Sequence, residues 1–328
     1  MVLKKIFKDH PVTVIIASLF ILGFLIYEFW NHFSPRSGFD WNKREISRIN
    51  VDSNDYYFAV FSDSKGHDAG FKPLLRDIDQ NKKISFAIGV GDLVREGRRW
   101  YYRRFVRQAQ KILTIPFLAV IGNHDLYKGS ENYQEMFGPT YYSFQIGQSS
   151  FIILDASMTS HFNKLERQWL EDELQRSQAA RVRFVFMHVP PFDPKEGRGY
   201  CLPEKDGKDL LDLFKRYQVT HLFVSHIHGY FSGVWEGVPY TITAGAGAGL
   251  RGNDPQHHFY HYVEVHVSGD KVETEPKRIY KETRLMDLFS YIADCGPEWG
   301  LLPGALISLF VLGLSIRRDS RKGKRKPL

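Results

Sequence analysis

The chain has 328 residues, 43% of them hydrophobic and 15% aromatic, a composition that excludes a disordered protein and allows one large domain or two ordinary ones. Its formal net charge is +7, but the excess of basic residues lies in 1–9 and 317–328, and the chain between them is close to neutral. Because the body lacks a net basic charge, no nucleic-acid partner is expected.

The first predicted element is an apolar segment, 11–27, that contains no charged residue. A helix of this length nearly crosses a hydrocarbon core about 30 Å thick, so 1–30 is predicted to be a basic start followed by a transmembrane anchor. A cleaved signal peptide is the alternative. The residues that follow, NHFSPRSG, lack a small-x-small cleavage site, which favours the anchor. Residues 31–50 are predicted to be a linker.

The body, 51–280, alternates strand-like and helix-like patterns. Apolar, β-rich runs predict strands at 56–62, 85–91, 115–121, 141–147, 149–156, 182–189, 221–227, 239–245 and 261–267. Amphipathic spacing predicts helices at 68–81, 98–113, 164–177 and 207–217. This alternation predicts an α/β fold, and the late strands without intervening helices predict a second sheet packed on the first.

The chain beyond the body contains a second uncharged apolar run, 300–316, followed at once by the basic tail 317–328. Residues 281–299 are predicted to be a juxtamembrane segment. The abrupt basic stop favours a second transmembrane helix; because the run is short and contains Pro303, a buried or interfacial helix is the alternative.

Two transmembrane helices with basic flanks determine the predicted topology. The positive-inside rule places both termini in the cytoplasm and the body on the extracytoplasmic side of the lipid bilayer, in the periplasm or at the cell exterior. There Cys201 and Cys295 can form one disulfide, and two free thiols are the alternative.

Polar clusters follow five of the predicted strands. They contain Asp63, Asp92, Asn123 with His124, His188, and His226 with His228. Alone, an Asp after a strand is usually a cap or turn residue, and a lone His is more often structural. Because the C-terminal ends of strands meet at one edge of an α/β sheet, five clusters in series predict one site. Carboxylate, imidazole and amide ligands without thiolate suit Mn, Fe or Zn, and a carboxylate that bridges two such ions is the two-metal arrangement for reactions at phosphorus.

In their order, these motifs resemble those of the calcineurin-like metallophosphoesterase superfamily, over about residues 56–262. The matching segments are the altered Asp-x-His at 63–65, Gly-Asp at 91–92, Gly-Asn-His-Asp at 122–125, His188 and His-x-His at 226–228. The resemblance implies a double β-sheet sandwich flanked by helices (αββα) and two divalent metal ions, Mn, Fe or Zn. It implies that Asp92 bridges the metals. The remaining ligands would be Asn123, His188 and His226 for one metal, and Asp63 and His228 for the other.

The resemblance also implies two catalytic residues. His124 would stabilise the developing phosphoryl charge or protonate the leaving oxygen, and Asp125 would orient its imidazole. Arginine forks suit phosphate oxygens, so Arg95 and Arg251, which follow the motifs closely, are candidate substrate-binding residues.

One position departs from the family pattern, because Lys65 stands where the first motif usually has its histidine. A protonated ammonium has no lone pair and cannot bind a metal ion. Three alternatives follow. The first metal could bind with fewer ligands, His67 could replace the missing ligand, or Lys65 could contact the substrate phosphate. We favour weakened binding of that metal with Lys65 facing the phosphate; a solvent-exposed Lys65 is the remaining alternative.

The predicted function is that of a membrane-anchored, extracytoplasmic phosphoesterase. It would hydrolyse phosphate mono- or diesters by a metal-activated hydroxide, and its position at a bilayer makes lipid-linked phosphates one substrate hypothesis. A nuclease or nucleotide phosphodiesterase is an alternative, which the near-neutral body disfavours. A degenerate, membrane-bound binding protein is the other, suggested by Lys65.

Overall fold

The computed structural model describes most of the body. The described residues are 40–52, 54–194, 199–282 and, in the first apolar segment, 12, 15, 16, 18–23 and 26. Among these residues no helix has the length and the apolar character of a membrane span. The predicted helix at 300–316 and most of the one at 11–27 lie outside the described residues, as does Cys295, so these features stay predictions.

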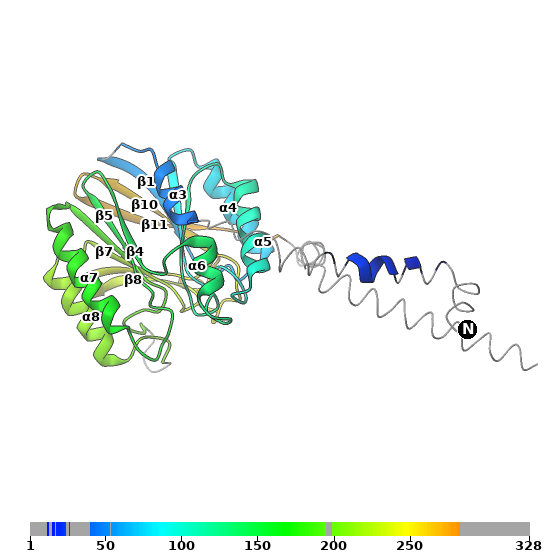
Figure 1. The fold of residues 1–328 in the computed structure, drawn as a ribbon. Coiled ribbons are helices and arrows are strands. Elements are labelled where there is room, and N and C mark those ends of the chain that lie inside the picture. Colours follow the sequence, from blue (N-terminus) through cyan, green and yellow to red (C-terminus); the bar gives the residue numbers. More distant parts are fainter. Residues whose placement is uncertain are drawn as a thin grey trace, which may run out of the picture. The chain divides into compact units, whose positions relative to one another are not determined.

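The body is built around two β-sheets (Figure 1). One sheet has five strands in the order β11-β10-β1-β2-β3, and the other has six in the order β4-β5-β6-β7-β9-β8. The strands of the first are β1 (Asp55–Phe61), β2 (Ile84–Val90), β3 (Phe117–Val120), β10 (His261–Ser268) and β11 (Lys271–Arg278). Those of the second are β4 (Tyr142–Ile146), β5 (Ser149–Ile153), β6 (Val182–Phe186), β7 (His221–Val224), β8 (Tyr230–Trp235) and β9 (Val238–Thr243).

An aromatic core lies between the two sheets. Alternate residues of β1 point to opposite faces, so Phe58 and Val60 join this core, whereas Ala59 and Phe61 join the core under the helices. Phe58 stacks on Phe86 of the neighbouring strand at a centroid distance of 5.1 Å. It also meets Phe184 of the other sheet edge-on at 5.4 Å. These contacts hold the sheets together and set the spacing of the loops at their ends.

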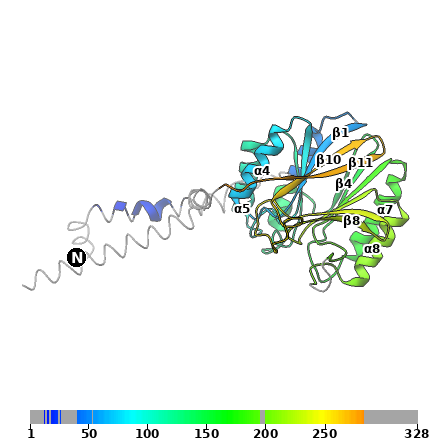
Figure 2. The same cartoon turned by 180° about the vertical axis from the view of Figure 1, so that it is seen from behind.

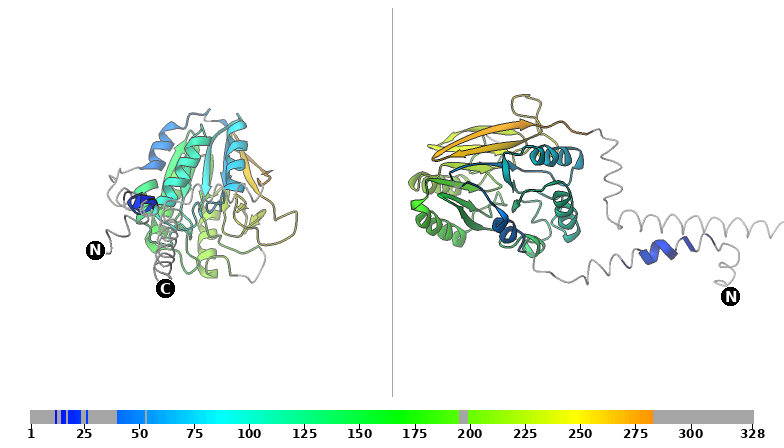
Figure 3. Two further views of the ribbon diagram at one scale, coloured as in Figure 1. Left: turned by 90° about the vertical axis from the view of Figure 1, so that its right-hand side faces the viewer. Right: turned by 90° about the horizontal axis from the view of Figure 1, so that it is seen from above.

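Helices cover the outer face of each sheet. Those packed in the core of the first sheet are α3 (Trp41–Arg48), α4 (Asp68–Gln80), α5 (Arg99–Ile112) and α6 (Glu131–Phe137). Those of the second sheet are α7 (Lys164–Arg176) and α8 (Glu204–Arg216), with the short 3₁₀ helix η1 (Ser177–Ala179) after α7. Seen from behind and from two further sides, the two sets of helices lie on opposite sides of the sheets (Figures 2 and 3). The predicted αββα sandwich is therefore confirmed.

Helix α3 lies inside the segment for which the sequence predicts a linker. Trp41 donates its indole N–H to the carbonyl of Phe117 at 2.7 Å, and Asn42 bonds both the carbonyl and the amide of Ala119. Residues 41–48 therefore belong to the body, where they cover the end of the first sheet. The sequence WNKREISR is mostly polar, and its packing depends on contacts made about 77 residues away.

Three further elements occur where the pattern predicts none. Strands β8 and β11 are the edge strands of their sheets and expose much of their length, so their sequences lack a continuous apolar run. Helix α6 has only seven residues, too few for a clear amphipathic period.

Candidate metal centre

The candidate ligands are brought together from both sheets. Strands β1, β2 and β3 are parallel neighbours in the first sheet, and β6 and β7 are parallel neighbours in the second. The predicted clusters follow these strands, so the site forms where the C-terminal ends of two sheets meet, whereas the sequence predicts one shared edge. Several contacts join the halves, among them the following two. Ser225 Oγ lies 2.5 Å from Asp63 Oδ2, and His188 Nδ1 lies 2.9 Å from the carbonyl oxygen of Val90.

Two glycines of the motifs make this close approach possible. A Cβ on Gly91 would lie 2.5 Å from His188 Nδ1, and the residue has a φ of +81°. A Cβ on Gly122 would lie 2.2 Å from the backbone nitrogen of Asp92. Only a residue without a side chain fits either position, which explains why the Asp and the Asn are each preceded by glycine.

Backbone strain is concentrated on the site residues. Asp63, Lys65, Asp92 and His226 all have left-handed backbone angles, with φ of 60°, 46°, 51° and 66°. This conformation costs about 1 to 2 kcal/mol for a residue with a side chain. Such strain persists only where the surrounding structure fixes the residue, and here all four strained residues belong to the predicted centre.

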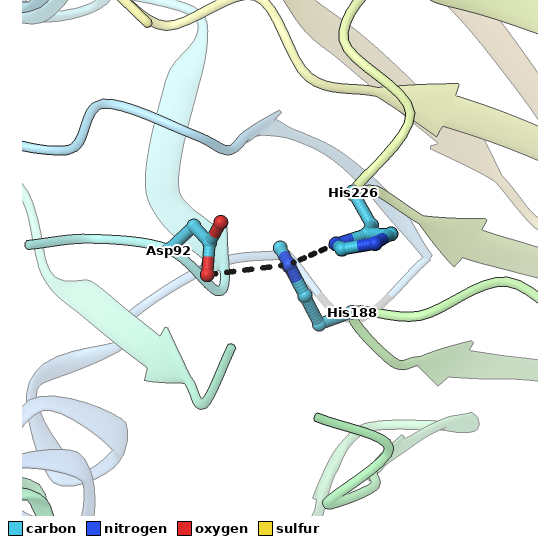
Figure 4. A group of neighbouring side chains, drawn as sticks. All are labelled: Asp92, His188 and His226. Carbon is cyan, nitrogen blue, oxygen red and sulfur yellow. Dashed lines mark hydrogen bonds and ion pairs between the residues drawn. The ribbon is translucent and has the colours of Figure 1, made fainter. Parts of the chain in front are cut away.

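Four donors form a set that fits a metal ion. Asp92, His188 and His226 each offer a ligand atom within 4.8 Å of the others, and they point toward one another from three different loops (Figure 4). Asn123 completes the set, because its Oδ1 lies 3.1 Å from His188 Nε2 and 2.9 Å from His226 Nδ1. One carboxylate, one amide oxygen and two imidazoles are donors that Mn, Fe and Zn accept.

The hydrogen bonds around His188 support a cation at this point. Its Nδ1 donates to the carbonyl of Val90, which leaves Nε2 to face Asn123 Oδ1 and, at 3.3 Å, Asp92 Oδ1. Burial lowers the pKa of His188, but the Asp92 carboxylate outweighs burial and raises it to about 9. A positive charge, either a proton or a metal ion, is thus stabilised at Nε2. The residues present therefore fit a divalent metal.

The second predicted ligand set converges on Lys65 instead. Its Nζ lies 2.9 Å from Asp92 Oδ2, 3.0 Å from His228 Nε2 and 3.4 Å from Asp63 Oδ1. In the described part of the chain, neither of these two carboxylate oxygens accepts a hydrogen bond of regular geometry. The ammonium therefore interacts with both oxygens as an ion pair. Burial opposes ionisation of Lys65, but the carboxylates of Asp63 and Asp92 outweigh it and raise its pKa.

This position decides among the interpretations of Lys65. The side chain is only 10% exposed, so the solvent-exposed alternative is wrong. His67 is exposed at the start of α4, whereas the ammonium of Lys65 itself lies among Asp63, Asp92 and His228. Lys65 thus contacts the residues predicted to hold the first metal, and the weakened binding of that metal stays a prediction.

The side chains of the two catalytic candidates bind different backbone groups. His124 Nδ1 lies 2.8 Å from the carbonyl oxygen of Arg95, which orients the imidazole. The carboxylate of Asp125 instead accepts the backbone N–H groups of Gly122, Leu93 and Val94 at 2.9 to 3.3 Å. Asp125 therefore fixes the loops after β2 and β3, and the predicted orienting contact with the imidazole is replaced by the one to Arg95.

The predicted substrate-binding arginines lie at the periphery. Arg95 has an exposed side chain and contributes its backbone carbonyl to the site. Arg251 stacks on the ring of Tyr200 at 5.2 Å, and Tyr200 meets His226 edge-on at 6.0 Å. Arg251 is therefore connected to the metal ligands through one aromatic ring.

Sequence reasoning missed several supporting groups. Ser62 and Ser225 hydrogen bond to Asp63 Oδ2, and Gly249 accepts a hydrogen bond from His228 Nδ1 at 2.5 Å. The serines each directly precede a predicted ligand, which is a usable signal. The Gly249 contact has no local signal, because it depends on how the glycine-rich loop at 245–249 packs.

The chain is similar to known phosphoesterases in sequence. A family model described as "Calcineurin-like phosphoesterase" matches residues 56–230. The rat protein "Serine/threonine-protein phosphatase CPPED1" is 27% identical over 193 residues, which cover 52% of this chain and 62% of the rat protein. The chain thus spans about three fifths of that relative.

Two solved structures share the fold. A purple acid phosphatase, PPD1, from yellow lupin superposes with a TM-score of 0.59 at 18% identity, covering 70% of this chain and 53% of the lupin chain. A dimetal phosphatase from Danio rerio superposes with a TM-score of 0.56 at 16% identity, covering 70% of this chain and 98% of the zebrafish chain.

Proposed function

The chain belongs to the calcineurin-like phosphoesterase family, and from this premise we propose that it is a metal-dependent hydrolase of phosphate mono- or diesters. The observation that carries the proposal is the donor set of Asp92, Asn123, His188 and His226, whose ligand atoms converge closely enough to bind one cation. A metal bound there would supply Lewis acidity toward a phosphoryl oxygen and would lower the pKa of a water molecule.

The chain's own residues would bind and orient the ester. Lys65 places a positive charge beside the donor set, within 2.9 Å of the carboxylate that both halves share, and can face the non-bridging oxygens of the phosphate. His124 is held through Nδ1, and in the described residues its Nε2 makes no hydrogen bond. When the ring is doubly protonated, that nitrogen carries a proton that it can donate to the leaving oxygen.

We further propose that the body acts at a membrane surface, on its extracytoplasmic side. The support is the two uncharged apolar segments, each next to a basic terminus. Because such anchoring holds the site near a bilayer, lipid-linked phosphate esters are the substrate class to test first.

Labelling of single introduced cysteines in intact cells tests the topology. If a cysteine introduced at an exposed body position, such as Asp172, were labelled only after membrane disruption, this result would contradict the extracytoplasmic placement.

The activity is tested with the full chain purified in detergent. After chelation, we expect Mn²⁺, Zn²⁺ or Fe²⁺ to restore hydrolysis of p-nitrophenyl phosphate or bis-p-nitrophenyl phosphate. His188→Ala should abolish the restored activity, and His161→Ala, an exposed histidine outside the site, should leave it unchanged. Absence of both metal binding and turnover would favour the binding-protein alternative. Activity on soluble esters with none on lipid phosphates in micelles would contradict the lipid-linked substrate.

A further inference from the structure

A lysine ammonium lies at the second cation position of the centre. Three groups surround Lys65 Nζ: the carboxylate oxygens Asp92 Oδ2 and Asp63 Oδ1, which it contacts as ion pairs, and the imidazole nitrogen His228 Nε2. His228 Nδ1 donates to the carbonyl of Gly249, so its Nε2 presents a lone pair. That lone pair lies 3.1 Å from Asp63 Oδ1. Two such acceptors stay this close because the cation of Lys65 contacts both.

The lysine is held in this position by its backbone. Its N–H donates to the carbonyl of Asp92 at 3.0 Å, and its left-handed φ of 46° directs the side chain into the centre. Asp63 is fixed in turn by Ser225 Oγ. Lys65 is therefore a buried part of the centre, unlike a surface lysine such as Lys82, whose side chain is 78% exposed.

A metal and this ammonium exclude each other. A metal at the second position would lie about 2.0 to 2.2 Å from the same carboxylate and imidazole atoms. Lys65 Nζ already occupies the space within about 3 Å of two of them. Both cations would also repel each other strongly in a buried site.

We propose that the centre binds a single metal ion, at Asp92, Asn123, His188 and His226, and that the Lys65 ammonium permanently replaces the second. The inference rests on the proposed function and specifies its cofactor stoichiometry. The ammonium supplies one fixed positive charge to the phosphate, so the second cation position needs no metal ion. Asp92 still links the two positions, because its Oδ1 faces His188 and its Oδ2 faces Lys65.

Metal counting tests the proposal. The full chain in detergent is stripped with a chelator, equilibrated with Mn²⁺ and freed of excess metal; bound Mn²⁺ is then counted by mass spectrometry and examined by electron paramagnetic resonance. We expect one Mn²⁺ per chain with the spectrum of an isolated ion. Lys65→His, which supplies the missing imidazole, should raise the count toward two and give a spin-coupled pair. Lys82→His, at an exposed lysine, should leave the count at one.

The outcomes separate the two proposals. Two Mn²⁺ per wild-type chain together with ester hydrolysis would overturn the single-metal proposal and leave the proposed function intact; a fall to one in His67→Ala would identify His67 as the replacement ligand. No bound metal and no hydrolysis would overturn both. If Lys65→His does not fold, the wild-type count and spectrum still decide the question.

Discussion

The two halves of the centre use similar ligands but differ in the group that lies among those ligands. On one side, the donor atoms of Asp92, Asn123, His188 and His226 lie close enough together to bind a metal ion; on the other, Asp63, Asp92 and His228 surround an ammonium. Carboxylate and imidazole occur in both halves, so ligand type alone does not decide the occupant. The difference arises from one side chain that reaches into the second set. Ligand motifs therefore predict where positive charge gathers, and the neighbouring residues determine which cation supplies it.

The largest effect is expected where the two halves meet. Asp92→Asn keeps the shape of the side chain but removes the charge that both cations share. We expect loss of the bound metal and a fall in kcat of more than about 10³-fold, because metal and lysine lose their common anion. Metal content and hydrolysis of p-nitrophenyl phosphate report the two effects. Asp172→Asn, on an exposed face of α7, is the control. Retained metal in Asp92→Asn would show that the other three ligands suffice.

The second test removes the cation from one half only. Lys65→Met keeps the length of the side chain and leaves Asp63 and Asp92 without their neighbouring ammonium. A buried charge whose partner is deleted destabilises a protein by about 3 kcal/mol, so we expect Tm without added metal to fall by about 6 to 12 °C. Excess Mn²⁺ should restore part of the loss, because a metal can then occupy the vacated position. Thermal denaturation with and without Mn²⁺ measures both changes, and an unchanged Tm would mean that Lys65 does not compensate these carboxylates.

A smaller effect is expected for a residue that binds neither cation. His124→Ala should lower kcat by about 10²-fold, because it removes the proton donor held by the Arg95 carbonyl. Metal content should stay at the wild-type value. Steady-state kinetics and metal counting on the same preparation distinguish this result from loss of a ligand. An equal loss of metal would mean that the imidazole supports the ligand loop rather than the chemistry.

The sequence predicts much of this centre, and the particular failures have physical reasons. Asp92, Asn123, His188 and His226 follow buried strands, and strand ends are visible in the pattern of apolar residues. The position of the Lys65 side chain is not visible in that pattern, because it depends on a left-handed turn and on His228, which lies 163 residues away. The same holds for Asp125, which bonds backbone amides of two loops, and for Trp41, whose burial depends on β3. Local patterns carry periodicity but not long-range contacts.

The pKa of a buried carboxyl group in this protein depends on whether a cation lies beside it. Asp63, beside Lys65 and His228, has a pKa well below its usual value although burial opposes this. Glu166 at the start of α7 is also buried, but it accepts only the backbone N–H of Asp155, at 2.6 Å, within the described residues. Burial and the Asp155 carboxylate raise the pKa of Glu166 to about 8. The cation, rather than the depth of burial, decides the charge state.

Glu166→Gln tests this conclusion through the pH dependence of stability. Because its pKa is higher in the folded state, wild-type Glu166 binds a proton on folding between about pH 4.5 and 8, and stability is lost as the pH rises through that window. The amide of Gln can still accept the Asp155 N–H but does not ionise. We therefore expect the stability of the variant to increase relative to the wild type between pH 5 and pH 9 by about 4 kcal/mol, with a corresponding relative rise in Tm. Asp172→Asn on the same helix should show no such gain. If the difference in Tm between Glu166→Gln and the wild type did not change with pH, water would reach Glu166 and its carboxylate would ionise without a cost in stability.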